Sequence, residues 1–250
     1  MPSSEPVAFV TGGAGGLGSA ICRALAGAGY SVAVGYHSSG ERADRLATSL
    51  PRKGHSSVRA PVTDSAAMRA MAAQVAERYG RCDVLVNCAG ITRFVEHRDL
   101  DALDDDLIDA ILATNVKGAF AAVRALLPLL RLSTQPGGGV VINISSIAAR
   151  TAMGSNVLYC ASKAALDNMT QSLARALAPT VRVVSVSPGL ADTDFVKSMD
   201  SEWREAQAAR TPLGRLAQPE EVGAAVVAAV RDLTFTTGCI LPVDGGRPLN

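Results

Sequence analysis

Short runs of valine and isoleucine recur along this chain, and each is followed by a longer segment with the hydrophobic period of a helix. An apolar run of roughly four to eight residues is typical of a strand that is buried on both faces of a sheet. Strands that alternate with helices pair in parallel, because each helix returns the chain to the edge where the next strand begins. The pattern therefore predicts an α/β fold, a doubly wound parallel sheet of about seven strands flanked by helices. The expected strands are 7–11, 31–35, 56–62, 82–87, 140–145, 181–187 and 239–243.

One long interruption breaks this alternation, between residues 190 and 216. The segment is polar and charged, and it holds the only tryptophan, Trp203. A long interruption at the carboxyl edge of a parallel sheet is typical of a lid over a substrate site. The remaining residues suit one domain with a single large core, and no linker or internal repeat divides them. We therefore expect a single domain over residues 1–250 with a substrate lid at about 190–216.

Composition excludes several classes of function. Apolar residues make up 48% of the chain but aromatic residues only 4%, and the net charge is +1. The sequence therefore offers neither a basic surface nor stacking aromatic side chains to nucleic acid. Its apolar runs are shorter than the ~20 residues of a membrane span, and no basic segment leads into an apolar one at the start. We expect neither nucleic acid nor a membrane as a partner.

The cysteines and histidines indicate the compartment and argue against a metal. The five cysteines are scattered and odd in number, so they form neither a disulfide framework nor a zinc-binding spacing. The three histidines are isolated from one another, and no metal site is expected. Free thiols are typical of a reducing environment, which makes a cytoplasmic location the expectation.

A glycine-rich stretch follows the first expected strand directly. Residues Thr11–Gly18 read TGGAGGLG and lead into a helix expected from about Leu17 to Ala28. The backbone amides of such a turn can approach a phosphate closely, and the positive end of the helix dipole adds to the attraction. Strand, loop and helix come in the order of a dinucleotide-binding, Rossmann-type unit. The alternative is a flexible glycine turn that binds no ligand.

The end of the second expected strand bears on the choice of cofactor. An acidic residue there would accept a hydrogen bond from the ribose 2′-hydroxyl of NAD and repel a 2′-phosphate. This strand ends instead in Tyr36, His37, Ser38 and Ser39. The serine hydroxyls can donate hydrogen bonds to a phosphate, and His37 or Arg42 can add positive charge. The sequence thus favours NADP(H), with NAD(H) as the second choice. An equally good interpretation is that the serines cap the helix that follows.

Three residues between the fifth strand and the next helix suit acid–base chemistry. Ser146 follows the apolar run VVINIS, while Tyr159 and Lys163 stand four residues apart in a helix expected at about 156–178. Residues four apart share one face of a helix. A tyrosine with its ordinary pKa near ~10 is a poor catalyst at neutral pH, but a neighbouring ammonium favours the phenolate and lowers that pKa. The alternative is an ordinary surface pair on an amphipathic helix.

Other residues at element ends have structural or binding interpretations. The fourth strand runs into Asn87-Cys88-Ala89-Gly90, where small residues let the backbone lie flat against a nucleotide. Asn115 falls inside an expected helix, where asparagine is mildly unfavourable and therefore often has a specific role or faces water. Asp64 is expected to cap a helix, and the acidic run 104–106 suits another helix N-terminus.

Taken together, these residues resemble the motifs of the short-chain dehydrogenase/reductase family over essentially the whole chain. Within that family, the segments NCAGITR and TGCILPVDGG are similar to the 3-oxoacyl-acyl-carrier-protein reductases. The chain departs from common family patterns at Cys88, where a second asparagine is frequent, and at Gly15, where NADP-preferring members often carry a basic residue. The markers appear in family order as Thr11-Gly12-x-x-x-Gly16-x-Gly18, Asn87-x-Ala89-Gly90, Asn115, Ser146, Tyr159-x-x-x-Lys163, Pro188-Gly189 with Thr193, and Val243-Asp244-Gly245-Gly246.

The resemblance implies roles for four catalytic residues. Tyr159 would be the general acid for carbonyl reduction and the base for the reverse reaction. Lys163 would lower the pKa of Tyr159 and hold the nicotinamide ribose. Ser146 would hydrogen-bond the carbonyl oxygen, and Asn115 would hold a water that connects Lys163 to solvent.

It also implies a set of cofactor-binding residues. The loop glycines would line the pyrophosphate, and Thr193 would bind the carboxamide region. Besides Tyr159, Lys163 and the residues at the end of the second strand, the expected set is Gly12, Gly16, Leu17, Gly18, Val62, Asn87, Ala89, Gly90, Pro188, Gly189 and Thr193.

The function implied in this way is an NADP(H)-dependent reductase of a ketone, with a 3-oxoacyl thioester as one candidate substrate. The partner would be a small-molecule carbonyl or a substrate bound to an acyl carrier, and the enzyme would be a homotetramer. Two alternatives remain open at this stage. One is an NAD(P)-dependent dehydrogenase of a sugar or secondary alcohol, and the other is a catalytically silent dinucleotide sensor.

Overall fold

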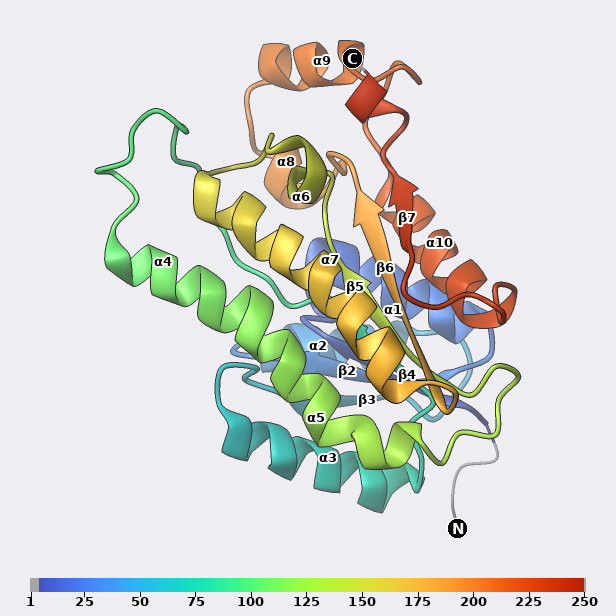
Figure 1. Cartoon of the computed structure of the whole chain (residues 1–250). Coiled ribbons are helices and arrows are strands. Elements are labelled where there is room, and N and C mark those ends of the chain that lie inside the picture. The colour runs from blue at the N-terminus through green and yellow to red at the C-terminus, as the bar shows by residue number, and fades with distance from the viewer. Residues whose placement is uncertain (1–4, 250) are drawn as a thin grey trace.

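Seven parallel strands form one central sheet in the computed structural model, which describes residues 5–249 (Figure 1). Their order across the sheet is β3-β2-β1-β4-β5-β6-β7, so the direction of strand addition reverses between β1 and β4. β1 pairs in parallel with both, placing Val7 opposite Ser31 of β2 and Thr11 opposite Asn87 of β4. In doubly wound sheets, such a reversal opens a ligand crevice at the carboxyl ends of the strands. The strands are β1 (Val7–Thr11), β2 (Ser31–Tyr36), β3 (Ser56–Arg59), β4 (Val84–Asn87), β5 (Gly139–Ile144), β6 (Val181–Pro188) and β7 (Ile240–Val243).

Alternate residues of each central strand pack into separate cores on the two faces of the sheet. In β1, Ala8 and Val10 belong to the core beneath one helical layer, while Val7 and Phe9 belong to the core beneath the other. All four are fully buried, which explains why they form a continuous run of apolar residues with no polar residue between them. The predicted fold class, a doubly wound parallel sheet of seven strands flanked by helices, is confirmed.

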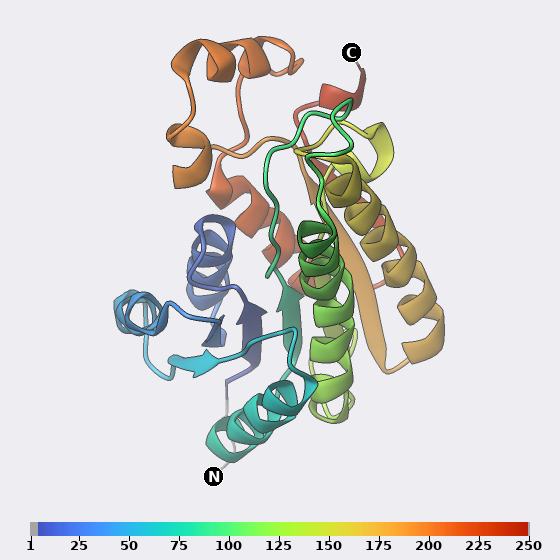
Figure 2. The same ribbon diagram turned by 90° about the vertical axis from the view of Figure 1, so that its left-hand side faces the viewer.

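Two layers of helices cover the sheet (Figure 2). Helices α1 (Gly16–Gly27), α2 (Gly40–Ser49) and α10 (Pro219–Arg231) pack on one face. On the other face lie α3 (Ser65–Tyr79), α5 (Ala119–Leu130) and α7 (Val157–Leu177). The predicted caps are confirmed at two N-termini. The Asp64 side chain accepts from the amides of Ala66 and Ala67, and that of Asp104 accepts from the amide of Leu107.

The long helix that contains Asn115 is not a regular α-helix. It begins as α4 (Asp105–Leu112), widens into a π-helical turn, η1 (Ala113–Gly118), and continues as α5. A π-turn holds one residue more than an α-turn, and such turns are frequent at functional sites. Asn115 lies inside it and is buried, so the sequence-based alternative of a water-facing side chain is wrong.

The composite helix formed by α4, η1 and α5 is longer and more apolar than the separate apolar runs in the sequence suggested. Among residues 5–249, the stretch Asp105–Leu130 is long and apolar enough to cross a membrane, judged by length and composition alone. Core helices pass the same test, and 44% of its most apolar window is buried inside the fold.

Short elements gather above the carboxyl edge of the sheet (Figure 1). The interruption expected at about 190–216 contains α8 (Asp194–Lys197) and α9 (Ser201–Ala209). The four-residue helix α6 (Ala148–Thr151) and the 3-10 turn η2 (Arg247–Leu249) lie near them. The third strand ends at Arg59, before the predicted Val62, because the chain turns after Ala60 donates to the carbonyl of Tyr36. Val62 therefore lies in the loop after β3 and not in the strand.

Candidate active site at the carboxyl edge of the sheet

The glycine-rich loop between β1 and α1 forms a tight cradle. Gly12 has a φ of +62°, in the left-handed region that favours glycine. A Cβ on Gly18 would lie 2.2 Å from the carbonyl oxygen of Gly12, so this position has no room for a side chain. The N-cap of α1 is Gly15, which makes no side-chain cap, and the first turn of α1 contains no acid. Backbone amides at this helix start are thus available to an anion.

The loop after β4 is held against this cradle by one hydroxyl. Thr11 Oγ1 accepts hydrogen bonds from the amides of Cys88, at 3.0 Å, and Ala89, at 3.1 Å. The same hydroxyl donates to the carbonyl of Val86. A Cβ on Gly12 would approach Ala89 Cα to 2.9 Å, which shows how closely the two loops lie. They meet at the reversal point of the sheet, between β1 and β4.

Asn87, expected to bind the cofactor, has its side chain engaged inside the protein. Its amide donates to Asn143 Oδ1 at 2.9 Å and to the carbonyl of Ala119 at 3.4 Å. Asn143 in turn donates to Thr170 on α7. The amide nitrogen of Asn87 therefore ties β4 to β5 and α5, while its Oδ1 is buried and has no hydrogen-bond partner within residues 5–249.

Thr193 is the other predicted residue that reaches the cradle. A Cβ on Gly16 would lie 3.0 Å from Thr193 Cβ, so the start of α8 rests directly on the glycine loop. The chain arrives there from β6, which ends at Pro188, and through Gly189, which packs against Asp244. Thr193 thus borders the cradle, while Pro188 and Gly189 lead the chain from β6 toward it.

The residues after β2 lie at the other end of the crevice. Tyr36 is partly buried, while His37, Ser38 and Ser39 are exposed. Ser39 is the N-cap of α2 but makes no side-chain cap, so the capping interpretation is wrong for this serine. Val62, expected among the cofactor residues, is buried, and a Cβ on Gly118 of η1 would approach its Cγ2 to 2.7 Å.

Arg42 stands near the same end. Its guanidinium faces Asp194 of α8 across 3.8 Å, and both side chains are largely exposed. An exposed pair at this distance contributes little stability. Arg42 is therefore free to exchange this carboxylate for another anion.

Ser146, Tyr159 and Lys163 converge as the spacing predicted. Ser146 follows β5, and its hydroxyl accepts from the amide of Ala148 at 3.1 Å. The Ser146 and Tyr159 side chains are joined by a hydrogen bond that acts to lower the pKa of Tyr159. The ammonium of Lys163 lies 5.7 Å from the centre of the Tyr159 ring and donates to the carbonyl of Ile144 at 2.8 Å. An ordinary surface pair is excluded for Lys163, which is only 7% exposed.

Asn115 joins the π-turn to both neighbours of the site. Its Oδ1 accepts from the amide of Ile91 at 2.9 Å, and its Nδ2 donates to Ser162 Oγ at 3.0 Å and to the carbonyl of Ile91 at 3.1 Å. A Cβ on Gly90 would lie 3.3 Å from Asn115 Oδ1 and 3.7 Å from Lys163 Nζ. The β4 loop, η1 and α7 therefore meet beside Lys163.

The electrostatic expectation for Tyr159 requires a correction. Burial raises the pKa of Tyr159, and the hydrogen bond from Ser146 only partly opposes this effect. Burial also lowers the pKa of Lys163 from 10.5 to about 8. The expectation of a lowered pKa for Tyr159 is thus wrong for the protein alone, because desolvation dominates and the groups that shift this pKa do not include Lys163.

Asn156 is a residue whose position at the site the sequence analysis did not anticipate. Its Oδ1 caps α7 by accepting from the amide of Tyr159 at 2.6 Å. Its Nδ2 donates to the carbonyl of Arg93 at 2.8 Å and to Thr92 Oγ1 at 3.2 Å. The side chain is fully buried and fastens the loop after β4 to the start of the Tyr159 helix. Asparagine before a helix suggests a cap, but no local pattern reveals the partner loop.

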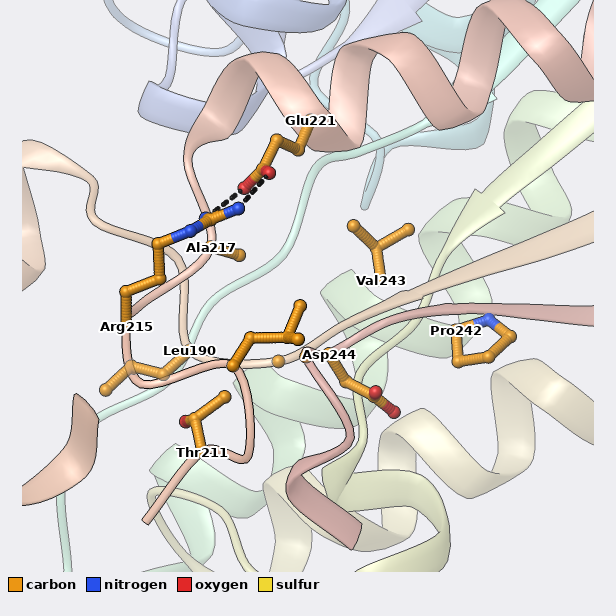
Figure 3. A pocket seen from close by; sticks show the side chains of 11 residues that line it. Leu190, Thr211, Arg215, Ala217, Glu221, Pro242, Val243 and Asp244 are labelled. Carbon is orange, nitrogen blue, oxygen red and sulfur yellow. Dashed lines mark hydrogen bonds and ion pairs between the residues drawn. The ribbon is translucent and has the colours of Figure 1, made fainter. Parts of the chain in front are cut away.

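A pocket opens beyond Gly189, between the carboxyl ends of β6 and β7 and the base of the 190–216 segment (Figure 3). Leu190, Thr211 and Asp244 are among the residues that line it. One wall is fixed by Arg215, whose two terminal nitrogens donate to Glu221 at 2.8 and 2.7 Å. This pair holds the pKa of Glu221 at about 2, well below its usual range. Within residues 5–249, no group of three or more His, Cys, Asp or Glu side chains could hold a metal ion.

Comparison with known proteins identifies the family. A family model described as "Enoyl-(Acyl carrier protein) reductase" matches residues 12–247. A ketoacyl reductase described for the granaticin polyketide synthase of Streptomyces violaceoruber is 40% identical, over 98% of this chain and 96% of its own.

The chain belongs to the short-chain dehydrogenase/reductase family.

Two further relatives show how closely this short-chain dehydrogenase/reductase follows others in length and shape. Cis-4-hydroxycyclohexanecarboxylate dehydrogenase of Sinomonas cyclohexanicum is 38% identical over 97% of this chain and 96% of its own. The crystal structure of a short-chain dehydrogenase/reductase from Burkholderia xenovorans superposes with a TM-score of 0.89, at 32% identity, covering 99% of this chain and all of the other.

Short-chain dehydrogenase/reductases are oxidoreductases that use an NAD(P) dinucleotide, and the residues at the sheet reversal fit that group. Gly12 and Gly18 leave no side chain in the cradle. The uncapped start of α1 offers amides to a pyrophosphate. The crevice then runs from the exposed serines after β2 at one end to Tyr159 and Lys163 at the other. A nicotinamide bound along it supplies or accepts a hydride.

Proposed function

We propose that this short-chain dehydrogenase/reductase reduces a ketone to a secondary alcohol with NADPH, and that Tyr159 is the proton donor. The observation that supports this most directly is the convergence of Ser146, Tyr159 and Lys163 beside the glycine cradle. A silent dinucleotide sensor has no need of this set. The first test is turnover, measured as the loss of NADPH absorbance against a panel of ketones. Complete inactivity of the wild type with every ketone and cofactor, while dinucleotide still binds, would favour the sensor.

The roles of the side chains follow from their positions. Ser146 hydrogen-bonds the carbonyl oxygen, where negative charge grows during reduction. Tyr159 transfers its phenolic proton to the same oxygen. Lys163 stabilises the phenolate that is left, and its buried ammonium contacts the nicotinamide ribose. Asn115, fixed by three hydrogen bonds, holds the β4 loop and supports a water beside Lys163 through which the proton is replaced.

The preference for NADP(H) rests on the end of β2. Ser38 and Ser39 are exposed, Ser39 is not used as a helix cap, and the nearby Arg42 is only loosely paired. These groups suit a 2′-phosphate, although Gly15 offers no positive charge on the loop. Fluorescence titration should show tighter binding of NADPH than NADH, and the difference should shrink in Arg42→Ala. Tighter binding of NADH by the wild type would overturn the preference.

The substrate is proposed to be a small-molecule carbonyl or a 3-oxoacyl thioester on an acyl carrier. The similarity to a ketoacyl reductase at 40% identity supports the thioester. Acetoacetyl thioesters on N-acetylcysteamine and on an acyl carrier protein test this in parallel with simple cyclic ketones. A thioester substrate should give the higher kcat/KM, and cyclic ketones that outperform both thioesters would reject it.

A second candidate is an alcohol dehydrogenase that works in the oxidative direction. It is favoured by the 38% identity to a dehydrogenase of a ring alcohol. The two candidates differ in kcat/KM for cyclic secondary alcohols with NAD or NADP. Oxidation that exceeds reduction at neutral pH would favour the dehydrogenase.

We further propose a homotetramer in the cytoplasm, with residues 190–216 as the substrate lid. The exposed apolar side chains of Leu112, Phe120 and Val157 lie on α4, α5 and α7, and they offer a surface to other copies. All five cysteines are free, in keeping with a reducing compartment. Analytical ultracentrifugation should give four times the chain mass. A Phe120→Lys variant should dissociate, and a monomeric wild type would exclude the tetramer.

A further inference from the structure

The face of α7 that carries Tyr159 and Lys163 continues into a third ionisable residue. Asp167 lies four residues beyond Lys163, so the three side chains occupy successive turns of one helical face. Asp167 is 6% exposed and Lys163 is 7% exposed. A buried acid next to a buried amine on the same face is rarely incidental, because each charge is costly to bury alone.

The carboxyl group of Asp167 is only half engaged. Its Oδ1 accepts from Ser185 Oγ on β6 at 2.7 Å. Its Oδ2 is buried and has no hydrogen-bond partner within residues 5–249. Ser187, two residues along β6 on the same face, is also buried with an unpaired hydroxyl. No basic side chain in the described part of the chain forms an ion pair with Asp167. The basic group that Asp167 can influence is therefore Lys163, one turn away on the same helix.

Few charged groups on the surrounding elements can act on Lys163. The thiol of Cys88 lies near, but burial raises the pKa of Cys88 to about 11, so it carries no charge at neutral pH. Lys117 of η1 and Asp109 of α4 are exposed. Arg150 of α6 pairs with Asp244, and Arg182 of β6 binds backbone carbonyls, including that of Val230. Asp167 is the remaining charge, and it raises the pKa of Lys163 against the effect of burial.

We propose that Asp167 is a positioning residue for the reaction, whose buried carboxyl group keeps Lys163 protonated beside Tyr159. The proposal rests on the proposed function of Tyr159 and Lys163. It adds a role for Asp167, which lies one helical turn beyond Lys163. Ser185 on β6 donates a hydrogen bond to the carboxyl group but carries no charge itself. Lys163 can then remain an ammonium at neutral pH in a place where burial alone favours the free amine.

The test removes the charge and keeps the shape. In Asp167→Asn, the amide oxygen still accepts from Ser185, but the negative charge is gone. The fall in kcat/KM for ketone reduction at high pH should begin at least about one pH unit lower than in the wild type, which lowers the protonated fraction of Lys163 at pH 8 about fivefold. Ser185→Ala is the matched control, because it removes the hydrogen bond and leaves the charge. Its profile should keep the wild-type midpoint even where the protein is less stable.

A second readout does not depend on turnover. The chain has four lysines, Lys53, Lys117, Lys163 and Lys197, so a lysine with labelled Cε can be followed by NMR and assigned with Lys163→Met. The titration midpoint of Lys163 should fall in Asp167→Asn and also in Asp167→Ser, which serves if the asparagine variant does not fold. An unchanged midpoint in either folded variant overturns the proposal. If the wild type reduces no ketone, the proposed function fails, while the NMR titration still decides the effect of Asp167 on Lys163.

Discussion

At the scale of single residues, Tyr159 and Lys163 show why burial has to be known before a pKa can be predicted. The sequence correctly placed a phenol, an amine and the Ser146 hydroxyl at one strand end, because strand ends and helical spacing are local properties. It could not give the sign of the shift at Tyr159. That sign depends on how much protein closes over the ring, and burial there outweighs the hydrogen bond from Ser146.

Replacement of Tyr159 by phenylalanine tests the proton donor. Tyr159→Phe removes only the hydroxyl, so the ring still packs and the cradle is untouched. Turnover should fall by at least about a hundredfold, a typical contribution of general acid catalysis. The Kd for NADPH from fluorescence titration should change little. Turnover close to that of the wild type would refute the assignment.

The pH dependence of ketone reduction follows from two shifts of opposite direction. Burial raises the pKa of Tyr159 above its ordinary value, so the donor keeps its proton throughout the neutral range. The pKa of Lys163 is lowered to about 8, so its ammonium is present below that pH and is lost above it. The value of kcat/KM for reduction should therefore be constant at low pH and fall as pH rises through about 8.

The fall of kcat/KM above about pH 8, the alkaline limb of the profile, is measured from reduction rates against pH at saturating cofactor. Lys163→Arg is the informative variant, because a guanidinium keeps its charge in this range, so the remaining activity should lose the limb. A wild-type rate that stays constant up to pH 10 would contradict the role of the ammonium.

At the scale of elements, Asn156 connects the Tyr159 helix to the loop after β4. Its three side-chain hydrogen bonds cap α7 and hold Thr92 and Arg93. The cap is readable from sequence, since asparagine before an apolar periodic segment is a helix start. The loop contact spans more than sixty positions along the chain, and no periodicity carries such information.

Asn156→Ala should therefore affect stability and substrate binding together. The free energy of unfolding should fall by about 2 kcal/mol, the scale of a lost cap and unpaired buried groups. The KM for ketone should rise more than kcat falls, because the loop loses its anchor while Tyr159 and Lys163 stay in place. Urea unfolding and steady-state kinetics measure the two effects.

Asp64→Ala provides the matched control for Asn156. It also removes a helix cap, on α3, but Asp64 follows β3, across the sheet reversal from the Tyr159 helix, and is exposed. This variant should lose stability and keep the KM for ketone. An equal rise of KM in both variants would mean that the effect at Asn156 is general destabilisation.

At the scale of the whole molecule, one buried arginine joins the last strands to the rest of the sheet. Arg182 on β6 donates to the carbonyls of Ala229 and Val230 at the end of α10. It also donates to the carbonyls of Leu233 and Thr236, which precede β7, and of Gly137, which precedes β5. The order of the strands follows from connection rules, but this side chain's five backbone partners come from two segments far apart in the sequence and required the structure.

Arg182→Gln should destabilise the entire fold. Several carbonyl groups would lose their donor, at about 1–3 kcal/mol for each buried group left unpaired, so the loss should be at least about 3 kcal/mol. Urea unfolding followed by circular dichroism measures it. Arg45→Gln is the control, because the Arg45 side chain is 72% exposed and should contribute almost nothing. A change at Arg182 as small as that at Arg45 would refute its role.

The π-helical turn at Ala113–Gly118 makes the chain sensitive to its own length at this point. Deleting one residue there would turn the wide turn into an ordinary α-turn, and because the extra residue is absorbed within that turn, α4 and α5 would keep their places. Asn115 would be drawn out of its position, and its hydrogen bonds to Ile91 and Ser162 would be lost. A single lost codon would thus release the loop after β4 beside Lys163 while every strand of the sheet stayed in register.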